Sequence, residues 1–237
     1  NTPFTIRIPA SAFMAPQAST TTAAFKPGVI LGYSADKGYY AVPHIYENGE
    51  FIVTVSEGHK LVYRTEQITF DDIQGSIFQD EIEYLASRFV IKGFDNATFR
   101  PDENITRGQF AALISRALDL KPTKATTFRD GFYSSYRDDM QAVYESGIMR
   151  GYSDTTFGAD DPLTREQAAA TMARVLEYLD YEAKRNLAYF TDKEDINPEF
   201  VKQIELLNTL NIMSGHADGS FKPKDLLTRG QLTKILQ

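Results

Sequence analysis

The pattern of apolar positions changes between the N-terminal part of the chain and the rest. Up to residue 66, short apolar and aromatic stretches are separated by Gly and Asn, which is typical of strands joined by turns. We expect strands over residues 30–33, 39–42, 51–55 and 60–64. Glu47-Asn48-Gly49-Glu50 predicts a hairpin turn, because Asn-Gly suits the positive φ angles of a type I′ turn.

From residue 67 onward the apolar residues recur at helical spacing. Ile82, Leu85 and Phe89 lie at i, i+3 and i+7 and form one stripe. Similar stripes contain Met140 and Val143, and Ile204 and Leu207. Each stripe precedes a glycine, which predicts that the helix ends at the glycine and that the glycine acts as a helix stop or a tight-turn residue. After a turn-rich loop, a second apolar stripe follows in each case: Phe110, Leu113, Ile114, Ala117 and Leu118; Ala168, Met172, Val175 and Leu176; Leu232, Ile235 and Leu236.

These elements belong to a unit that occurs three times. The matching stretches read GFDNATFRPDENITRGQ from Gly93, GYSDTTFGADDPLTREQ from Gly151 and GHADGSFKPKDLLTRGQ from Gly215. A Phe-x-Asp pair opens each unit and ends at Asp72, Asp130 or Asp192. We expect a mainly α chain with a β-rich segment over 1–66, possibly the end of a larger module, and repeats over 67–125, 126–186 and 187–237. One helix–loop–helix cannot bury its apolar face alone, but three together can.

The segment Thr-Arg-x-Gln opens each second helix. Threonine and glutamine in these places predict a capping box. The arginine needs another explanation, because a cation in the first helical turn opposes the helix dipole at a cost of roughly 0.3–1 kcal/mol. Either it binds an anion together with the free amides of the helix start, or it forms a salt bridge to Asp72, Asp130 or Asp192 or to a loop carboxylate. Both roles are compatible.

The three units resemble S-layer homology repeats, which hold surface-layer proteins and some wall-associated enzymes on Gram-positive bacteria. The resemblance covers about residues 68–237 and rests on the Phe-x-Asp opening, the Gly-aromatic loop and Thr-Arg-x-Gln, all in order. It implies a pseudo-threefold, three-pronged assembly around a three-helix bundle. Grooves between the prongs would bind an anionic secondary cell wall polysaccharide through a pyruvate ketal.

On this resemblance, arginines would meet the carboxylate, aspartates would accept sugar hydroxyls or orient the arginine, and the remaining groups would line the grooves. The implied ligand-binding residues are Arg107, Arg165 and Arg229; Thr106, Thr164 and Thr228; Gly93, Gly151 and Gly215; Asp72, Asp130 and Asp192; Gln109, Gln167 and Gln231; Phe94 and Tyr152.

The chain departs from the family pattern in three ways. Each signature ends in glutamine where the family commonly has glutamate, which removes a charge that could neutralise the arginine. There is no tryptophan for sugar stacking. The residue after the loop glycine varies from Phe94 to Tyr152 to His216, so we expect the third repeat to bind poorly.

The composition of the chain disfavours several classes of function. A net charge of −7 disfavours binding to nucleic acid or anionic lipid, and no apolar run is long enough to insert in a membrane. The N-terminus lacks the regions of a signal peptide, which indicates a mature chain or a piece of a longer one. Without cysteine, and with three scattered histidines, we expect no metal, cofactor or catalytic residue.

We therefore expect a cell-wall anchor of a secreted bacterial protein, located in the wall or S-layer. Two alternatives come from other classes. One is the anchoring tail of a wall-associated glycoside hydrolase, and the other is a self-assembling S-layer lattice protein with contacts through its β-rich segment.

Overall fold

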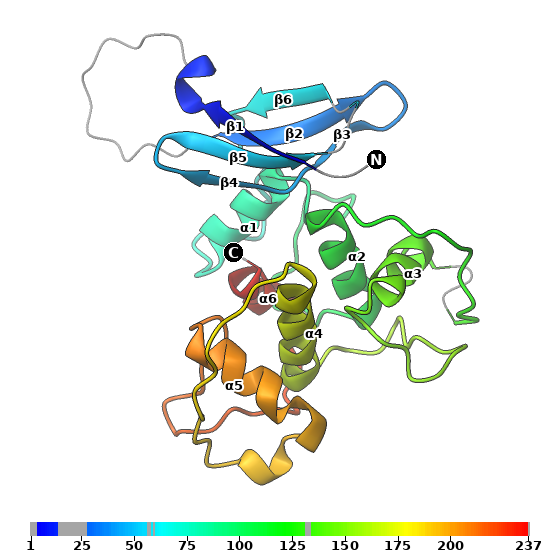
Figure 1. The fold of residues 1–237 in the computed structure, drawn as a ribbon, viewed down its shortest axis with the longest axis vertical. Coiled ribbons are helices and arrows are strands. Elements are labelled where there is room, and N and C mark those ends of the chain that lie inside the picture. Colours follow the sequence, from blue (N-terminus) through cyan, green and yellow to red (C-terminus); the bar gives the residue numbers. More distant parts are fainter. Residues whose placement is uncertain (1–3, 14–27, 56–57, 59, 131–133, 237) are drawn as a thin grey trace. The chain divides into compact units, whose positions relative to one another are not determined.

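The computed structural model describes the chain except for residues 1–3, 14–27, 56–57, 59, 131–133 and 237 (Figure 1). The chain packs into two compact units. One comprises Asn1–Phe99 and Arg116–Asp119, and the other Arg100–Ser115 and Leu120–Gln237. These units describe packing, and the expected sequence boundaries at residues 66, 125 and 186 stay predictions.

The first unit contains two antiparallel sheets of three strands each (Figure 1). One sheet has the order β1-β5-β4 and the other β3-β2-β6. The strands are β1 (Phe4–Pro9), β2 (Val29–Ser34), β3 (Gly38–Ala41), β4 (His44–Glu47), β5 (Glu50–Val55) and β6 (Lys60–Arg64). A one-turn 3₁₀ helix, η1 (Ala10–Ala12), follows β1.

The four predicted strands are confirmed as β2, β3, β5 and β6, and the hairpin turn is confirmed between β4 and β5. Asn48 and Gly49 have φ angles of 53° and 82°, as a type I′ turn requires. Strands β1 and β4 were not predicted. Strand β1 is an edge strand with no fully buried side chain, so its sequence carries only a weak apolar signal.

The core of this unit lies between the sheets and includes Ile30, Phe51 and Val53, each at most 1% exposed. Strand β2 is buried on both faces, because its alternate residues Val29 and Leu31 are also buried. The end of helix α1 (Gln79–Ser87) meets the strands, where Arg88 Nη2 donates to the carbonyl of His44 at 2.8 Å.

Each repeat has the two predicted helices. The first helices are α1, α3 (Arg137–Glu145) and α5 (Val201–Thr209), and the second are α2 (Arg107–Ala117), α4 (Arg165–Tyr178) and α6 (Arg229–Ile235). Two short 3₁₀ helices, η2 (Lys193–Asp195) and η3 (Pro198–Phe200), precede α5. The central residues of the predicted apolar faces are buried, as Phe110, Ala168 and Leu232 illustrate at 0% exposure. Residues toward the ends of the faces are only partly buried: Phe89, Ala117, Leu118, Leu176, Ile235 and Leu236.

The predicted stop of the first helices at the loop glycine is wrong. These helices end earlier, and the left-handed residue that follows each end is Phe89, Gly147 or Asn211, with φ of 60°, 76° and 57°. The loop glycine is required for close packing instead. A Cβ at Gly93 would lie 2.2 Å from the ring of Phe70. The glycine therefore lets the opening phenylalanine lie against the loop backbone.

A closed ring of backbone hydrogen bonds joins the segments before the second helices. Leu163 N donates to Ile105 O at 2.9 Å, and Leu227 N donates to Leu163 O at 3.0 Å. Ile105 N donates to Leu227 O at 3.0 Å and closes the ring. The three side chains are at most 1% exposed. Residues from all three repeats thus meet at one buried point of the second unit.

Candidate functional site

The aspartate of each Phe-x-Asp opening anchors the loop of its own repeat. Asp130 accepts hydrogen bonds from the backbone N–H groups of Phe157 at 2.9 Å and Gly158 at 2.6 Å. Burial raises the pKa of Asp130, but these bonds outweigh burial and lower the pKa below its ordinary value. Asp72 likewise accepts from Phe99 N at 2.7 Å, and Asp192 accepts from Phe221 N at 2.8 Å.

The loop that the aspartate anchors also packs around two phenylalanines. The opening phenylalanine of each repeat lies against the loop phenylalanine, with ring centroids 5.2–5.5 Å apart. The pairs are Phe70 with Phe99, Phe128 with Phe157, and Phe190 with Phe221. These contacts hold the loop backbone rigidly, so its carbonyl groups keep fixed directions.

The repeated arginines clamp the loop of the following repeat. Arg107 Nε donates to the carbonyl of Phe157 at 3.1 Å, and its Nη2 donates to the carbonyl of Arg150 at 2.7 Å. Arg165 repeats the pattern with Phe221 at 3.0 Å and Ser214 at 3.1 Å. These carbonyls accept the side-chain hydrogen bonds of both arginines. Asp130 and Asp192 act on the arginines through the loop backbone that they hold and through their negative charge.

Backbone hydrogen bonds extend each clamp. Arg107 N donates to Asp161 O at 2.9 Å, and Arg165 N donates to Asp225 O at the same distance. Arg229, which is 8% exposed, donates its N–H to Glu103 O at 2.8 Å. The first helical turn, whose N–H groups lack helical partners, therefore binds loop carbonyls at each of these arginines.

Arg107 is also stacked on aromatic rings. Its guanidinium lies 4.6 Å from the ring centroid of Tyr152 and 5.1 Å from that of Phe157. Burial lowers the pKa of Arg107, while Tyr152, Asp161 and Asp130 act in the opposite direction. Arginine suits this place, because it stays charged and combines a planar donor fork with a face that stacks on rings.

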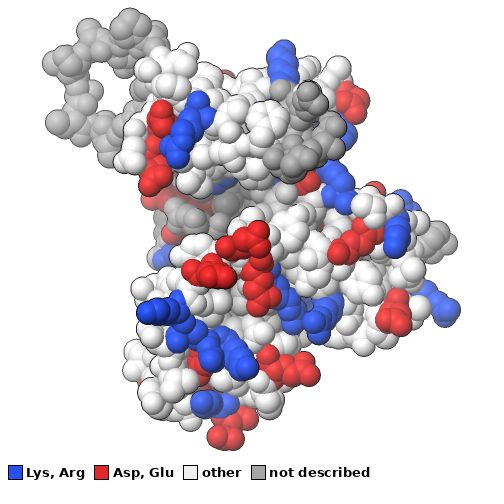
Figure 2. All heavy atoms as spheres, in the orientation of Figure 1, with Lys and Arg blue, Asp and Glu red and all other residues white. Residues whose placement is uncertain are grey.

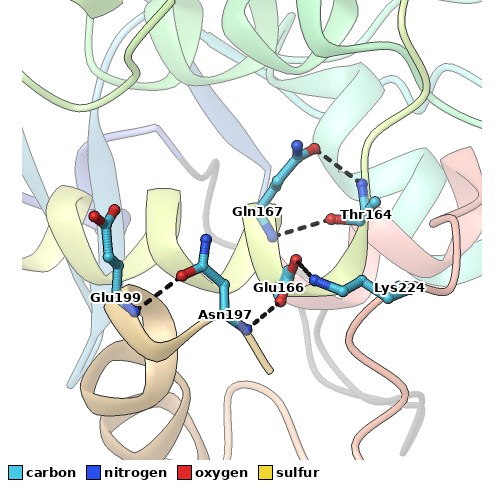
Figure 3. Close-up of polar contacts among 6 residues, drawn as sticks. All are labelled: Thr164, Glu166, Gln167, Asn197, Glu199 and Lys224. Atoms are coloured by element: carbon cyan, nitrogen blue, oxygen red, sulfur yellow. Dashed lines mark hydrogen bonds and ion pairs between the residues drawn. The ribbon is translucent and has the colours of Figure 1, made fainter. Parts of the chain in front are cut away.

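The threonines and glutamines of the signature form the predicted capping boxes. Thr164 Oγ1 accepts from Gln167 N at 3.3 Å, and Gln167 Oε1 accepts from Thr164 N at 3.2 Å (Figure 3). The same two bonds join Thr106 with Gln109, and Thr228 with Gln231. These side chains thus start the helices, whatever else they contact.

An open groove of about 900 Å³ lies on the second repeat. It is lined by residues 123–124, 144–145, 147 and 149–154. Of the residues implied by the family resemblance, the groove brings together Gly151 and Tyr152. Phe94, the residue of repeat 1 that matches Tyr152, is partly buried and donates its N–H to Thr98 O at 2.8 Å.

Sequence reasoning missed most residues of this groove, among them Lys124, Tyr144 and Arg150. Arg150 had a signal, since it directly precedes the loop glycine, where repeat 1 has Lys92 and repeat 3 has Ser214. Lys124 lies between repeats in sequence and follows no motif. Only the fold brings it to the groove, through hydrogen bonds to Glu145 from the N–H groups of Thr123 at 2.7 Å and Lys124 at 3.1 Å.

The contact between the second and third repeats carries an ion pair that the other repeats cannot form. Glu166 stands where the other signatures have Gly108 and Gly230. Figure 3 shows its carboxylate between Lys224 Nζ, at 2.5 Å, and the backbone N–H of Asn197, at 3.0 Å. The Glu166 side chain is 7% exposed and that of Lys224 is 61% exposed. A buried carboxylate thus depends on a cation at the surface.

We expect this ion pair to couple the two repeats measurably. In a double-mutant cycle of Glu166→Gln and Lys224→Met, the coupling free energy should be about 1 kcal/mol, a value reduced by the exposure of Lys224. Urea unfolding of the three variants measures it. The pair of Arg100 and Glu103, whose side chains are 41% and 55% exposed, is the control and should give a smaller coupling. Additive effects at Glu166 and Lys224 would contradict the expectation.

The surface charge is mixed. On the face shown in Figure 2, Lys and Arg side chains are interspersed with Asp and Glu, so no field of one sign covers it. None of the helices among the described residues is both long and apolar enough to cross a bilayer.

Comparison with known proteins identifies a family model and several relatives that this chain matches. The family model of the S-layer homology domain matches three times, at residues 69–111, 128–169 and 189–233. An endoglucanase of Bacillus sp. (strain KSM-635) is 33% identical over 158 residues, 65% of this chain and 17% of the relative. An amylopullulanase of Thermoanaerobacterium thermosulfurigenes is 30% identical over 172 residues, 71% of this chain and 9% of the relative.

A third relative is a surface-layer protein by name. The surface-layer 125 kDa protein of Lysinibacillus sphaericus is 28% identical over 164 residues, which are 68% of this chain and 14% of the relative. The chain spans less than a fifth of the length of each of these three relatives.

Proposed function

Because the chain belongs to the S-layer homology family, we propose that it holds a secreted bacterial protein on the cell wall by binding an anionic wall polysaccharide. Family membership makes it a cell-surface anchoring module of a bacterium. The finer proposal is that the polysaccharide carries a pyruvate ketal, whose carboxylate is recognised without a covalent bond.

The observation that carries the proposal is the repeated clamp between a second helix and the next loop. Arg107 and Arg165 make the same pair of carbonyl contacts, and the ring through Ile105, Leu163 and Leu227 links the repeats in a cycle. We therefore propose a pseudo-threefold assembly of three prongs with α2, α4 and α6 at its centre. Such an assembly presents similar loop surfaces several times, which suits a polymer with a repeating unit.

In this proposal the signature residues divide their roles. Arg107 and Arg165, and the aspartates Asp130 and Asp192, hold the loops, because the arginines donate to loop carbonyls and the aspartates accept from loop N–H groups. The threonines and glutamines start the helices. The glycine loops, with backbone such as that of Gly151 and rings such as that of Tyr152, line the polysaccharide surface.

We propose no catalysis within these 237 residues. The names of the relatives favour two larger settings: an endoglucanase and an amylopullulanase suggest an anchoring tail of a wall-associated hydrolase, and a surface-layer protein suggests a lattice component. In both settings the matched region would be the anchor, since the chain covers only a small share of each relative.

Calorimetric titration with purified wall polysaccharide tests the proposal. We expect binding to the native polysaccharide and at least ~10-fold weaker binding after chemical removal of pyruvate, because a charge-assisted contact is lost. The matched control is an uncharged wall glycan of similar length. Equal affinity for both forms would refute the role of the ketal. Absence of binding to either form would refute the anchor and favour the lattice protein.

A further inference from the structure

The ring of Tyr152 is exposed but held in place. The residue is 55% exposed, yet one side of its ring stacks on the guanidinium of Arg107 at 4.6 Å from the centroid. The ring also lies against Gly158, where a Cβ would be 2.4 Å from Cε2 of the ring. Gly158, whose φ is 77°, has no Cβ and therefore leaves this space to the ring. An exposed aromatic ring held this way is pre-organised to stack on a sugar, because little freedom is lost on binding.

Two cations that line the same groove as this ring have no partner within the described part of the chain. The carbonyl of Arg150 is held by Arg107, but for the Arg150 guanidinium the described residues provide no hydrogen bond or ion pair. The same holds for Nζ of Lys124 among those residues. Burial lowers the pKa of Arg174, and the charge of Arg150 lowers it further, so a third cation lies near the groove.

The two carboxylates of the groove differ in what they can accept. Glu145 already accepts from Thr123 N, Lys124 N and Gln141 Nε2, at 2.7–3.1 Å. These bonds lower the pKa of Glu145 to about 2, and the bond from Gln141 has the largest effect. Its negative charge is thus spread over internal donors. Asp154 lies in the wall of the groove and has a carboxylate that suits sugar hydroxyls.

We propose that this groove within the second repeat is the subsite for a sugar that carries a carboxylate. The sugar ring would stack on Tyr152, and its carboxylate would meet Arg150 and Lys124. Arg107 would position the platform rather than bind the anion, because its Nε and Nη2 donate to loop carbonyls. The inference rests on the proposed wall binding and assigns its anion recognition to residues outside the Thr-Arg-x-Gln signature.

The repeats differ in these positions. Around the loop glycine, repeat 2 has Arg150 and Tyr152, while repeat 3 has Ser214 and His216. Repeat 3 thus lacks both the arginine and the tyrosine of this arrangement. Repeat 1 has Lys92 and Phe94 in these places, and Phe94 is partly buried, unlike Tyr152. An arginine beside an exposed ring is thus found in repeat 2, to which the subsite is assigned.

An NMR titration with digalacturonate, a small acidic saccharide, tests the subsite directly. We expect amide shift changes at Gly151, Ser153 and Asp154, and affinity at least ~10-fold higher than for the neutral disaccharide galactobiose, since only the acid can pair with the two cations. Shift changes confined to other residues, or equal affinity for the two disaccharides, would overturn the assignment.

Variants separate the cations from the ring. Arg150→Gln should lower the affinity for digalacturonate ~10-fold and leave that for galactobiose unchanged. Tyr152→Leu should weaken both, and Tyr152→Phe, which keeps the ring, should weaken neither. Arg137→Gln is the matched control, because Arg137 is an exposed arginine of the same repeat paired with Asp138. Digalacturonate affinity of Arg150→Gln equal to that of Arg137→Gln would overturn the role of Arg150.

The same variants separate this inference from the anchor itself. If Arg150→Gln with Tyr152→Leu binds purified wall polysaccharide as well as the unchanged chain, the anchor stands and the subsite is wrong. If that double variant loses wall binding while Arg137→Gln keeps it, the subsite is supported. If the unchanged chain binds digalacturonate in the groove but no wall polysaccharide, the subsite stands and the anchor falls.

Discussion

Replacing Arg107 with alanine should lower the free energy of unfolding by about 3 kcal/mol, since hydrogen bonds from a charged donor contribute about 1.5–3 kcal/mol each and the desolvation of the arginine offsets part of this. The substitution leaves the buried carbonyl of Phe157 without its guanidinium donor and removes the bond to Arg150 O. It also removes the cation from the ring of Tyr152. Arg107→Lys should recover only a minor part, because an ammonium cannot reproduce the planar fork.

Urea unfolding followed by circular dichroism measures this effect. Arg137→Ala is the matched control, since its side chain is 47% exposed and it forms a surface ion pair at 3.4 Å. We expect the control to change stability by less than about 0.5 kcal/mol. Equal losses for the two alanine variants would show that the clamp is not a main support of the loop.

Lowering the pH from 7.5 to 5 should destabilise the first unit by about 2 kcal/mol through His44, by proton linkage from its pKa of about 4 in the folded chain. Burial lowers this pKa most, and the charge of Arg88 lowers it further. The hydrogen bonds require the neutral ring: Nδ1 must donate to Val42 O at 3.0 Å, and Nε2 must accept from Ile30 N at 3.4 Å.

The sign of this pH dependence follows from the direction in which folding shifts the pKa of His44. As the pH falls below the ordinary histidine value of about 6.5, the unfolded chain takes up the proton before the folded chain does. The stabilisation is therefore complete above that pH and is lost progressively toward pH 4. Carboxylates titrate mainly below this window, so the range from 7.5 to 5 isolates histidine.

Chemical unfolding at several pH values, with a probe in the β-rich unit, measures the slope. His44→Gln should flatten the dependence, whereas His216→Gln, at an exposed position, should leave it unchanged. A dependence that persists in His44→Gln would assign it to another group.

The sequence predicted the repeats and their local structure because these depend on neighbouring residues. The capping boxes at Thr106, Thr164 and Thr228 need only the offset of three to glutamine. Strands such as β5 follow from alternating apolar residues around an Asn-Gly turn. The helix stops were misplaced because Phe89 adopts a left-handed conformation that few would expect of an aromatic residue, while Gly93, the expected stop, serves ring packing.

The candidate site was predicted less well, because its contacts join residues far apart in the chain. Arg107 was expected to face an anion or an aspartate, but its partners are carbonyls of Arg150 and Phe157, which have no side-chain signature. Lys124 reaches the groove only because Glu145 binds the backbone beside it. No periodicity reports either contact.

By itself, the sequence determined that this chain consists of a β-rich segment and three helix–loop–helix repeats with an arginine at the start of each second helix. Periodicity and turn chemistry act over a few residues, so they are readable along the chain. The tertiary structure alone decided that Arg107 holds a loop, that Tyr152 becomes a fixed exposed platform, and that the Arg150 guanidinium has no hydrogen-bond or ion-pair partner among the described residues. These contacts depend on which groups lie close together across the repeats, and the packing of the repeats determines that.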